Sequence, residues 1–256
     1  MLWFTSLALW QQALLASLLM YAATALGASC VLFSGKIPQT LLTVLTGAAA
    51  GIMIAASFFS LLSPALEAES ALAPYLTVTL GFLAGGTFLI ISDLVLSRRE
   101  AKFRALGDSK TALLFFAVTL HNIPEGMAVG VAFAAAAGGG SVYSALLLAV
   151  GIAVQNFPEG MCVAFPLRAK GMSPFKSFAF SQGSGAIEIP ACILGALAAT
   201  AIAGILPWAL SFSAGAMIAV VCSELIPECF SGNKTVASAG LVAGFCLMMI
   251  LDLALG

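Results

Sequence analysis

Charged residues are scarce in this chain. Asp, Glu, Lys and Arg together make up only 8% of its 256 residues, whereas 61% are hydrophobic and the mean hydropathy is +1.10. A soluble domain carries about a quarter charged residues, so most of this surface must face the lipid bilayer. Ten Lys and Arg against 11 Asp and Glu leave a formal net charge of −1, which excludes nucleic-acid binding through a basic face. We therefore predict a polytopic membrane protein without a separate soluble domain.

Several patterns that would indicate other protein classes are missing. The six cysteines form no C-x-x-C pair and lie in or beside apolar segments, so we interpret them as small hydrophobic residues. The chain has no G-x-x-x-x-G-K-[ST] motif for ATP. It has no H-E-x-x-H motif of a metalloenzyme, since His121 is its only histidine. We therefore expect neither an enzyme nor an organic cofactor.

Long apolar stretches account for most of the sequence. About 20 apolar residues suffice to cross a bilayer, and within lipid a segment that bonds all its own backbone groups is an α-helix. We predict an all-α fold in which residues 1–256 form a single transmembrane domain. Charges, prolines and glycine clusters divide it into eight spans, at about 5–33, 39–66, 72–97, 111–137, 141–167, 175–204, 206–229 and 234–255.

The basic residues predict the orientation in the membrane. All ten Lys and Arg fall in or beside the connections on one side of the predicted bilayer, whereas Glu67 and Glu69 follow the second span on the other side. Connections rich in Lys and Arg stay in the cytoplasm. With an even number of spans, both termini are then extracytoplasmic. We expect a multi-pass protein of the cell membrane, that is, the plasma or inner membrane.

Parts of the sequence recur in other spans. The segment His121-Asn-Ile-Pro-Glu-Gly-Met in the fourth span returns in the fifth as Gln155-Asn-Phe-Pro-Glu-Gly-Met. Because neighbouring spans run in opposite directions, this is an inverted repeat, which is typical of secondary transporters. A weaker repeat relates spans two and three to spans seven and eight, for example through Ala50-Gly-Ile-Met-Ile-Ala and Ala214-Gly-Ala-Met-Ile-Ala. Apolar helices also resemble one another by chance, so this weaker match leaves both interpretations open.

Five ionisable residues lie in the bodies of the predicted spans, away from their ends. An ionised group at the bilayer centre costs on the order of 2.5–3.5 kcal/mol. Several such groups are tolerable if they face one another and share cations or protons, so we expect them to mark a functional site. They are His121, Glu125, Glu159, Glu188 and Glu224.

The fourth and fifth spans carry matching polar side chains. His121 and Glu125 lie one helical turn apart on one face, with Asn122 at its edge. The fifth-span counterparts are Gln155, Asn156 and Glu159. The proline before each glutamate removes a backbone N–H, so the helix can open a carbonyl toward a cavity. Imidazole nitrogen with carboxylate oxygen suits Zn²⁺, and also Fe²⁺, Mn²⁺, Co²⁺ or Cd²⁺. The set contains no thiol, so we expect it to bind a metal ion weakly enough to release it.

The chain resembles a known family at these positions. HNIPEG at 121–126 and QNFPEG at 155–160 resemble the paired signature of the ZIP (Zrt/Irt-like) divalent metal transporters, and SGAIEIP at 184–190 is similar to their sixth-span motif. The resemblance covers the full length and implies eight spans in a 3+2+3 inverted-repeat arrangement. It further implies a secondary transporter that brings divalent metal ions, Zn²⁺ first, into the cytoplasm, and a homodimer. Gln155, where many members have histidine, points to the bacterial GufA-like branch.

The resemblance also implies roles for individual residues. A binuclear metal centre between the fourth, fifth and sixth spans would hold the transported ions. Its main site would consist of His121, Glu125, Gln155 and Glu159. An adjacent site would add Asn122, Asn156 and Glu188, with Glu125 and Glu159 bridging the two ions. A rigid-body shift of spans one, four, five and six against the other four would expose the ions to the cytoplasm.

Alternatives remain for the residues and for the whole protein. Polar side chains in membrane helices often hydrogen-bond between helices, and Asn122 and Asn156 could cap freed carbonyls. Glu224 could be an exit ligand or an ordinary interhelical partner, and Asp93 could line the pathway or pair with nearby arginines. A metal/proton exporter would use the same residues with outward flux. An intramembrane metalloenzyme would use them to activate water.

Overall fold

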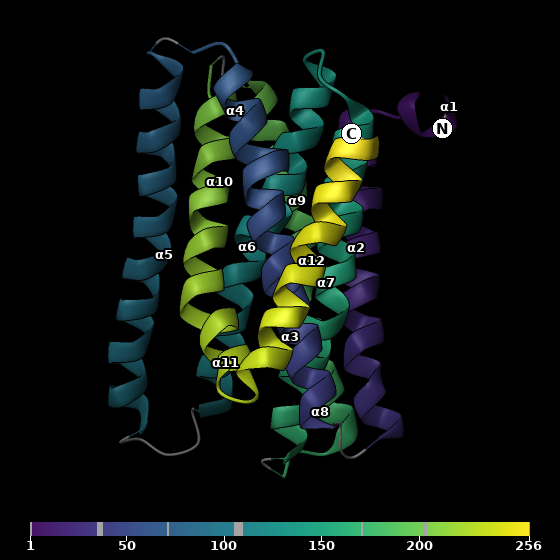
Figure 1. The fold of residues 1–256 in the computed structure, drawn as a ribbon, viewed down its shortest axis with the longest axis vertical. Coiled ribbons are helices and arrows are strands. Elements are labelled where there is room, and N and C mark those ends of the chain that lie inside the picture. The colour runs from purple at the N-terminus through teal and green to yellow at the C-terminus, as the bar shows by residue number, and fades with distance from the viewer. Residues whose placement is uncertain are drawn as a thin grey trace.

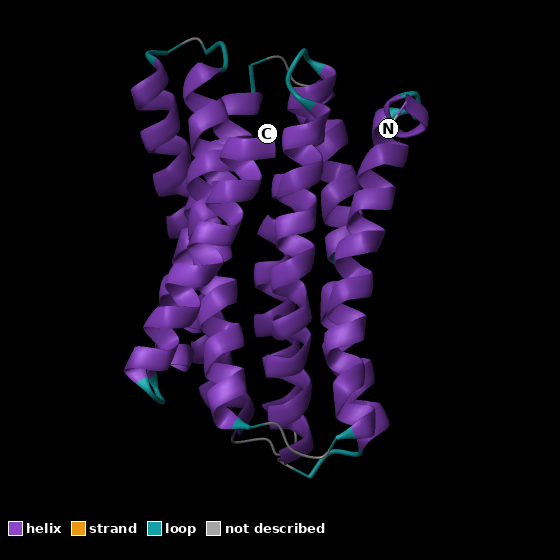
Figure 2. Ribbon diagram, turned by 45° about the vertical axis from the view of Figure 1, so that its right-hand side comes forward, coloured by secondary structure: helices purple, strands orange, loops and turns teal. Residues whose placement is uncertain are grey.

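Every regular element in the described part of the chain is a helix, which confirms the all-α prediction. The computed structural model describes residues 2–34, 38–70, 72–104, 110–169, 171–201 and 204–255; within them, the side chains of residues 2, 96–118, 120, 121, 166, 169 and 255 are left out. The α-helices are α1 (Leu2–Thr5), α2 (Leu9–Phe33), α3 (Gln39–Ala56), α4 (Ser63–Glu67), α5 (Pro74–Arg104), α6 (Lys110–Ala137), α7 (Val142–Ala169), α8 (Pro174–Gly185), α9 (Glu188–Ala201), α10 (Leu206–Val220), α11 (Ile226–Phe230) and α12 (Lys234–Leu255). Figures 1 and 2 show the long helices standing side by side in one bundle, with both termini at the same end.

Within the described ranges, seven helical segments are long and apolar enough to cross a membrane. They are Leu9–Phe33, Gln39–Glu67, Pro74–Val95, Val142–Phe165, Pro174–Ala201, Leu206–Phe230 and Lys234–Ala254. Each coincides with one of the predicted spans. The predicted fourth span is covered by the 28 residues of α6, whose first half lies largely among the side chains left out of the description. The chain is therefore a multi-pass membrane protein.

Two helix boundaries differ from the predicted spans. α2 begins at Leu9 rather than near residue 5, because a turn separates it from the short α1, where the Ser6 hydroxyl donates to the Trp3 carbonyl at 2.7 Å. α5 continues to Arg104, past the predicted end near residue 97. The Arg, Glu and Lys residues beyond that point are good helix formers, so the helix extends beyond the apolar stretch that hydropathy detects.

Three spans are interrupted rather than regular. The second contains a π-helix at Ser57–Leu62 (η1) and the seventh another at Val221–Leu225 (η2). Each is followed by a proline at the second position of the next α-helical segment, Pro64 in α4 and Pro227 in α11. Because proline has no N–H and its ring crowds the carbonyl four residues back, the backbone widens there by one residue. The sixth span breaks between α8 and α9, at Ala186 and Ile187.

Glycines bring four pairs of helices into backbone contact. A Cβ on Gly51 of α3 would lie 2.0 Å from the Leu241 carbonyl oxygen of α12, and one on Gly244 of α12 equally close to the Ala48 carbonyl oxygen. Similar contacts join α5 to α10, α2 to α7 and α6 to α9. In lipid, helices gain little from burying apolar side chains, so small residues that allow close packing hold them together. The bundle is thus assembled from four tight pairs.

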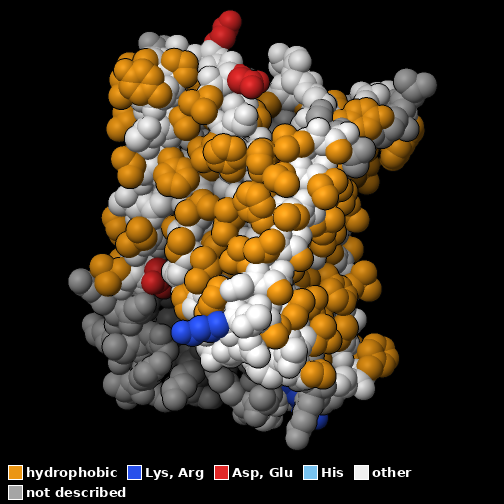
Figure 3. Space-filling view, in the orientation of Figure 1, with side chains coloured by type: hydrophobic (Ala, Val, Ile, Leu, Met, Phe, Trp, Pro, Cys, Tyr) orange, Lys and Arg blue, Asp and Glu red, His pale blue; other side chains and the backbone are white. Residues whose placement is uncertain are grey.

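The surface agrees with a lipid environment. Large hydrophobic side chains lie exposed along α5, including Leu80, Leu83, Phe88 and Ile90. Hydrophobic side chains cover most of the face seen in Figure 3, and the Lys and Arg side chains drawn there appear toward its lower end. Monomeric soluble proteins rarely expose contiguous apolar patches of this extent.

The contact between α3 and α12 can be tested at Gly51. We expect Gly51→Ala to destabilise the protein by about 1–3 kcal/mol, because the added methyl group has to push apart two backbones. Thermal unfolding of the purified protein in detergent would measure this as a lowered midpoint. Gly86→Ala is the matched control, since a Cβ there would find its nearest atom at an ordinary 3.4 Å. Equal midpoints for the two variants would contradict the proposed packing.

Candidate metal site

Three helices bring the predicted ligands together inside the bundle. α6 carries Asn122 and Glu125, α7 carries Gln155, Asn156 and Glu159, and α9 begins with Glu188. All six side chains are at most 9% exposed. The backbone of His121 belongs to α6, one turn before Glu125, but its side chain lies outside the described residues. The structure thus gathers six of the seven predicted residues in the interior of a membrane protein.

The glycine after each glutamate sets how closely the neighbouring helix approaches. A Cβ on Gly126 would lie 2.6 Å from the carbonyl oxygen of Glu188, so α9 packs its first residue directly against α6. A Cβ on Gly160 would lie 2.3 Å from the Thr24 carbonyl oxygen, which places α2 equally close to α7. Each Pro-Glu-Gly segment therefore supplies a carboxylate and, next to it, a glycine that lets the neighbouring helix pack closely. This packing role of the glycines was not predicted from the sequence.

The break in the sixth span places Glu188 at a helix start. Glu188 is the first residue of α9, after the non-helical Ala186 and Ile187. Backbone N–H groups at a helix N-terminus and the helix dipole favour a negative charge there. Interrupted helices near the middle of the membrane are typical of transporter binding sites. The break thus provides a suitable position for a buried carboxylate.

A chain of amide hydrogen bonds leads to Glu188. The Nδ2 of Asn156 donates to both carboxylate oxygens of Glu188, at 2.8 and 2.9 Å. The Nε2 of Gln155 in turn donates to the Oδ1 of Asn156 at 2.9 Å. The Met20 carbonyl of α2 lies 3.5 Å from the same Asn156 nitrogen. Side chains from adjacent positions of α7 are therefore linked to α9, and α2 borders this part of the site.

The α6 side of the site is different. Both amide atoms of Asn122 are buried without a hydrogen-bond partner among the described residues. The carboxylate oxygens of Glu125 make no hydrogen bond of regular geometry there either, although the Gln155 side chain lies near enough to interact with them. A buried polar atom left in this way costs roughly 1–3 kcal/mol, and more when it is charged. Glu125, Glu159 and Glu188 also lie close enough to repel one another electrostatically. The arrangement therefore favours binding of a positively charged group beside Glu125.

A closed metal shell is not evident from the protein side chains. No three His, Cys, Asp or Glu side chains in the described part of the chain stand where they could jointly hold an ion. That part does not include the side chain of His121, and three of the predicted ligands are amides. The seven-residue ligand set accordingly stays a prediction.

Further polar residues lie outside this group. Glu224 is exposed on η2, and Asp93 is exposed on α5. On the opposite half of the bundle, the Ser60 hydroxyl of η1 donates to the carboxylate of Asp252 in α12. Ser181 of α8 donates to the Gly160 carbonyl at 2.8 Å and so fixes α8 beside the residue that follows Glu159. Neither contact could be predicted from the sequence, because each joins residues on different membrane spans.

Comparison with known proteins now assigns the family. The family described as ZIP Zinc transporter matches residues 104–252. The chain is 38% identical to Zinc transporter GufA of Myxococcus xanthus, over 95% of this chain and 98% of that protein. It is 32% identical to human Zinc transporter ZIP11, over 96% and 97% of the two chains, and 36% identical to Zinc transporter ZIPB of Bordetella bronchiseptica, over 92% and 79%. These relatives are named as transporters rather than enzymes, and the chain belongs to the ZIP family.

Proposed function

We propose that this protein is a secondary transporter of divalent transition-metal ions, with Zn²⁺ as the first cargo and Fe²⁺, Mn²⁺, Co²⁺ and Cd²⁺ as further candidates. The observation that carries the proposal is the carboxylate of Glu125, which is buried inside a membrane protein close to the carboxylates of Glu159 and Glu188. A divalent cation would offset its charge and that of the neighbouring glutamates. The names of the relatives support zinc as the ion.

The cargo would bind between α6, α7 and α9. We assign the main position to His121, Glu125, Gln155 and Glu159, as the family resemblance implies. Asn122, Asn156 and Glu188 line the second position of a binuclear centre, with Glu125 and Glu159 between the two ions. The juxtaposition of the six described residues supports this assignment. Carboxylate and amide oxygens bind divalent ions more weakly than thiolates bind zinc, which suits a site that must release its ion.

The proposal includes eight spans in a 3+2+3 inverted-repeat arrangement, with α6 as the eighth membrane helix. The two π-helices support the repeat, because each begins on the second residue after the matched segments at Ala50–Ala55 and Ala214–Ala219. The helix pairs support it as well. If spans two and three correspond to seven and eight, the α3–α12 pair corresponds to the α10–α5 pair, and both are in backbone contact through glycine.

The same glycine contacts support a rigid-body movement of spans one, four, five and six against the other four spans. Each glycine contact that would bring a Cβ within 3 Å of another helix's backbone joins either two of spans one, four, five and six or two of the other four. Between the groups, the close glycine contact in the described residues is Gly151 of α7 against the flexible Met248 side chain of α12. A rigid-body shift of one group against the other would therefore keep the tight pairs intact.

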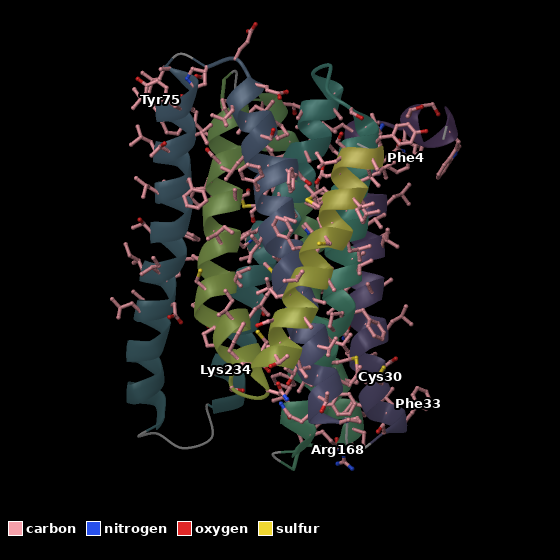
Figure 4. The ribbon with its side chains drawn as sticks, viewed as in Figure 1. Phe4, Cys30, Phe33, Tyr75, Arg168 and Lys234 are labelled. Carbon is pink, nitrogen blue, oxygen red and sulfur yellow. The ribbon has the colours of Figure 1, made fainter. Side chains whose placement is uncertain are left out.

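The orientation in the membrane is proposed separately from the direction of transport, which the family resemblance implies. Arg168 and Lys234 lie toward the lower end of the bundle in Figure 4, whereas both termini lie at the opposite end in Figure 1. The positive-inside rule then makes the lower end cytoplasmic and the termini extracytoplasmic. We propose uptake from outside into the cytoplasm across the plasma or inner membrane, by a homodimer as the resemblance implies.

Metal uptake into proteoliposomes tests the transport function. We expect saturable ⁶⁵Zn²⁺ uptake by the wild type and a fall to the rate of protein-free liposomes for the Glu125→Gln/Glu159→Gln variant, because the cation loses both central carboxylates. Competition by Cd²⁺, Fe²⁺, Mn²⁺ and Co²⁺ would rank the cargoes. Glu69→Gln, at an exposed position outside the site, should retain uptake. Equal uptake by the wild type and the double variant would refute the transport pathway.

The orientation can be tested with two inserted epitope tags. A tag after Gly256 should bind an impermeant antibody on intact spheroplasts. A tag after Gly171, in the connection between α7 and α8, should become accessible only after permeabilisation. Gly171 is exposed and a Cβ there would meet no atom within 4 Å, so the connection has room for the insertion. The opposite labelling pattern would place the termini in the cytoplasm and overturn the proposed orientation.

A further inference from the structure

A hollow opens on the outside of the bundle where α9 packs against α6. We call it the α6–α9 groove. It has a volume of about 260 Å³, and residues of α6, of α9 and of the break before α9 line it, among them Ile123, Met127, Ile187, Pro190, Leu194 and Ala198. We propose that the α6–α9 groove binds one acyl chain of a membrane lipid. The proposal depends on the location of the protein in a membrane and not on the proposed transport function.

Small residues form the floor of the groove. A Cβ on Gly195 of α9 would lie 2.8 Å from the Met127 carbonyl oxygen of α6, so the two backbones are nearly in contact there. Ala191, one turn before Gly195, is buried and belongs to the same lining. Larger apolar side chains, including Ile123 and Leu194, line the groove as well. Small residues among larger ones thus leave a hollow between two helices that are packed tightly together.

The chemistry of the lining favours a hydrocarbon over water. None of the residues that line the groove has a polar side chain, and a buried water needs two to four polar partners. An apolar cavity of about 150 Å³ inside a protein stays dry and takes up benzene or xenon. The α6–α9 groove is larger and also apolar, so a hydrocarbon group is the ligand that suits it.

The length of the groove matches one leaflet of a bilayer. Ile187 stands at the break about halfway along the sixth span, Pro174–Ala201. From there α9 runs toward the end of the bundle where the termini lie (Figure 1). At 1.5 Å per residue, the helix rises by about 16 Å between Ile187 and Ala198. Half of a hydrocarbon core about 30 Å thick is about 15 Å, so an acyl chain from that leaflet can follow the groove to its end.

The groove is continuous with surface that faces lipid. Leu194, in its lining, is 64% exposed, and the neighbouring Leu197 is 47% exposed. Acyl chains surround this side of α9 in the membrane, so one of them can enter the groove sideways without passing a polar layer. A chain in the groove contacts protein on several sides, whereas a chain on a flat helix surface contacts it on one. We therefore expect the groove to hold a lipid more tightly than the rest of the surface does.

The size of the groove distinguishes an acyl chain from a second copy of the protein. A helix with its side chains is about 10 Å across, which is too thick to enter a hollow of about 260 Å³. A second copy could cover the groove but could not fill it with a helix. A single unbranched chain has the right thickness and, as shown by the rise of α9, the right length.

Quenching of tryptophan by a brominated lipid tests the site in the full-length protein in detergent. Leu197→Trp places a reporter beside the groove without changing its lining, and Leu83→Trp on α5 is the matched control, since Leu83 is 57% exposed. Each variant is titrated with dibromostearoyl phosphatidylcholine, and the wild type, with its three tryptophans, gives the background. Half-maximal quenching of Leu197→Trp should need roughly tenfold less lipid than that of Leu83→Trp, because the groove adds contacts to the chain.

Two outcomes of this titration would overturn the proposal. Equal half-maximal concentrations for the two variants would mean that the groove holds lipid no better than an ordinary helix surface. A Leu197→Trp reporter that no lipid quenches, while Leu83→Trp is quenched, would mean that a second copy of the protein covers the groove.

Filling the groove tests where the lipid binds. In the Leu197→Trp background, Ala198→Phe adds a ring to the lining and should raise the half-maximal concentration to that of Leu83→Trp. Ala201→Phe, at an exposed position of α9 outside the lining, should leave it unchanged. Equal effects of the two substitutions would place the bound lipid outside the groove.

Competition by unlabelled lipids tests which part of the lipid binds. Dipalmitoyl phosphatidylcholine should displace the brominated lipid from the Leu197→Trp variant. Dihexanoyl phosphatidylcholine has the same headgroup, but its chains are too short to fill a groove about 16 Å long, so it should not displace the brominated lipid at the same concentration. Equal displacement by both lipids would show that the headgroup is recognised and would refute an acyl-chain site.

Discussion

The burial of three carboxylates between apolar helices is the constraint on which the rest of this structure depends. Each would cost on the order of 2.5–3.5 kcal/mol if it were ionised at the centre of a bilayer, and their proximity adds mutual repulsion. Two features of the fold offset part of this cost at Glu188: the Asn156 amide donates hydrogen bonds to its carboxylate, and the residue stands at the start of α9. At Glu125 the described residues supply no more than the nearby Gln155 side chain. We therefore expect a bound cation to stabilise the protein mainly through its contacts with the α6 side of the site.

Close packing through glycine explains how these carboxylates come together without a soluble core. The Gly126 contact sets α9 against α6 within reach of Glu125, and the Gly160 contact sets α2 against α7. Because a larger residue at either position would meet backbone, the spacing between the buried carboxylates and the strength of the helix pair depend on the same short segment. A change that loosens either helix pair would therefore also move one of the proposed ligands.

Much of the fold could be predicted from the sequence, since hydropathy reports directly on membrane spans. The spacing of Asn122 and Glu125 and of Asn156 and Glu159 also fixed which side chains share a face. The sequence could not show that Asn156 donates to Glu188, because that bond depends on how α9 packs against two other helices. It could not show the π-helices either, although Pro64 and Pro227 stand beside them, since a proline in a membrane helix can equally produce a simple kink.

The unequal surroundings of Asn122 and Asn156 follow from what packs beside each helix. An inverted repeat of the fourth and fifth spans alone would create two equivalent half-sites. The helices that flank them are not equivalent, because α9 is interrupted and begins with Glu188 whereas α2 is one continuous helix that presents the Met20 carbonyl and Thr24. One carboxylate from outside the repeat therefore engages one of the two asparagines. A pair of matching motifs thus becomes a site with two distinct sides.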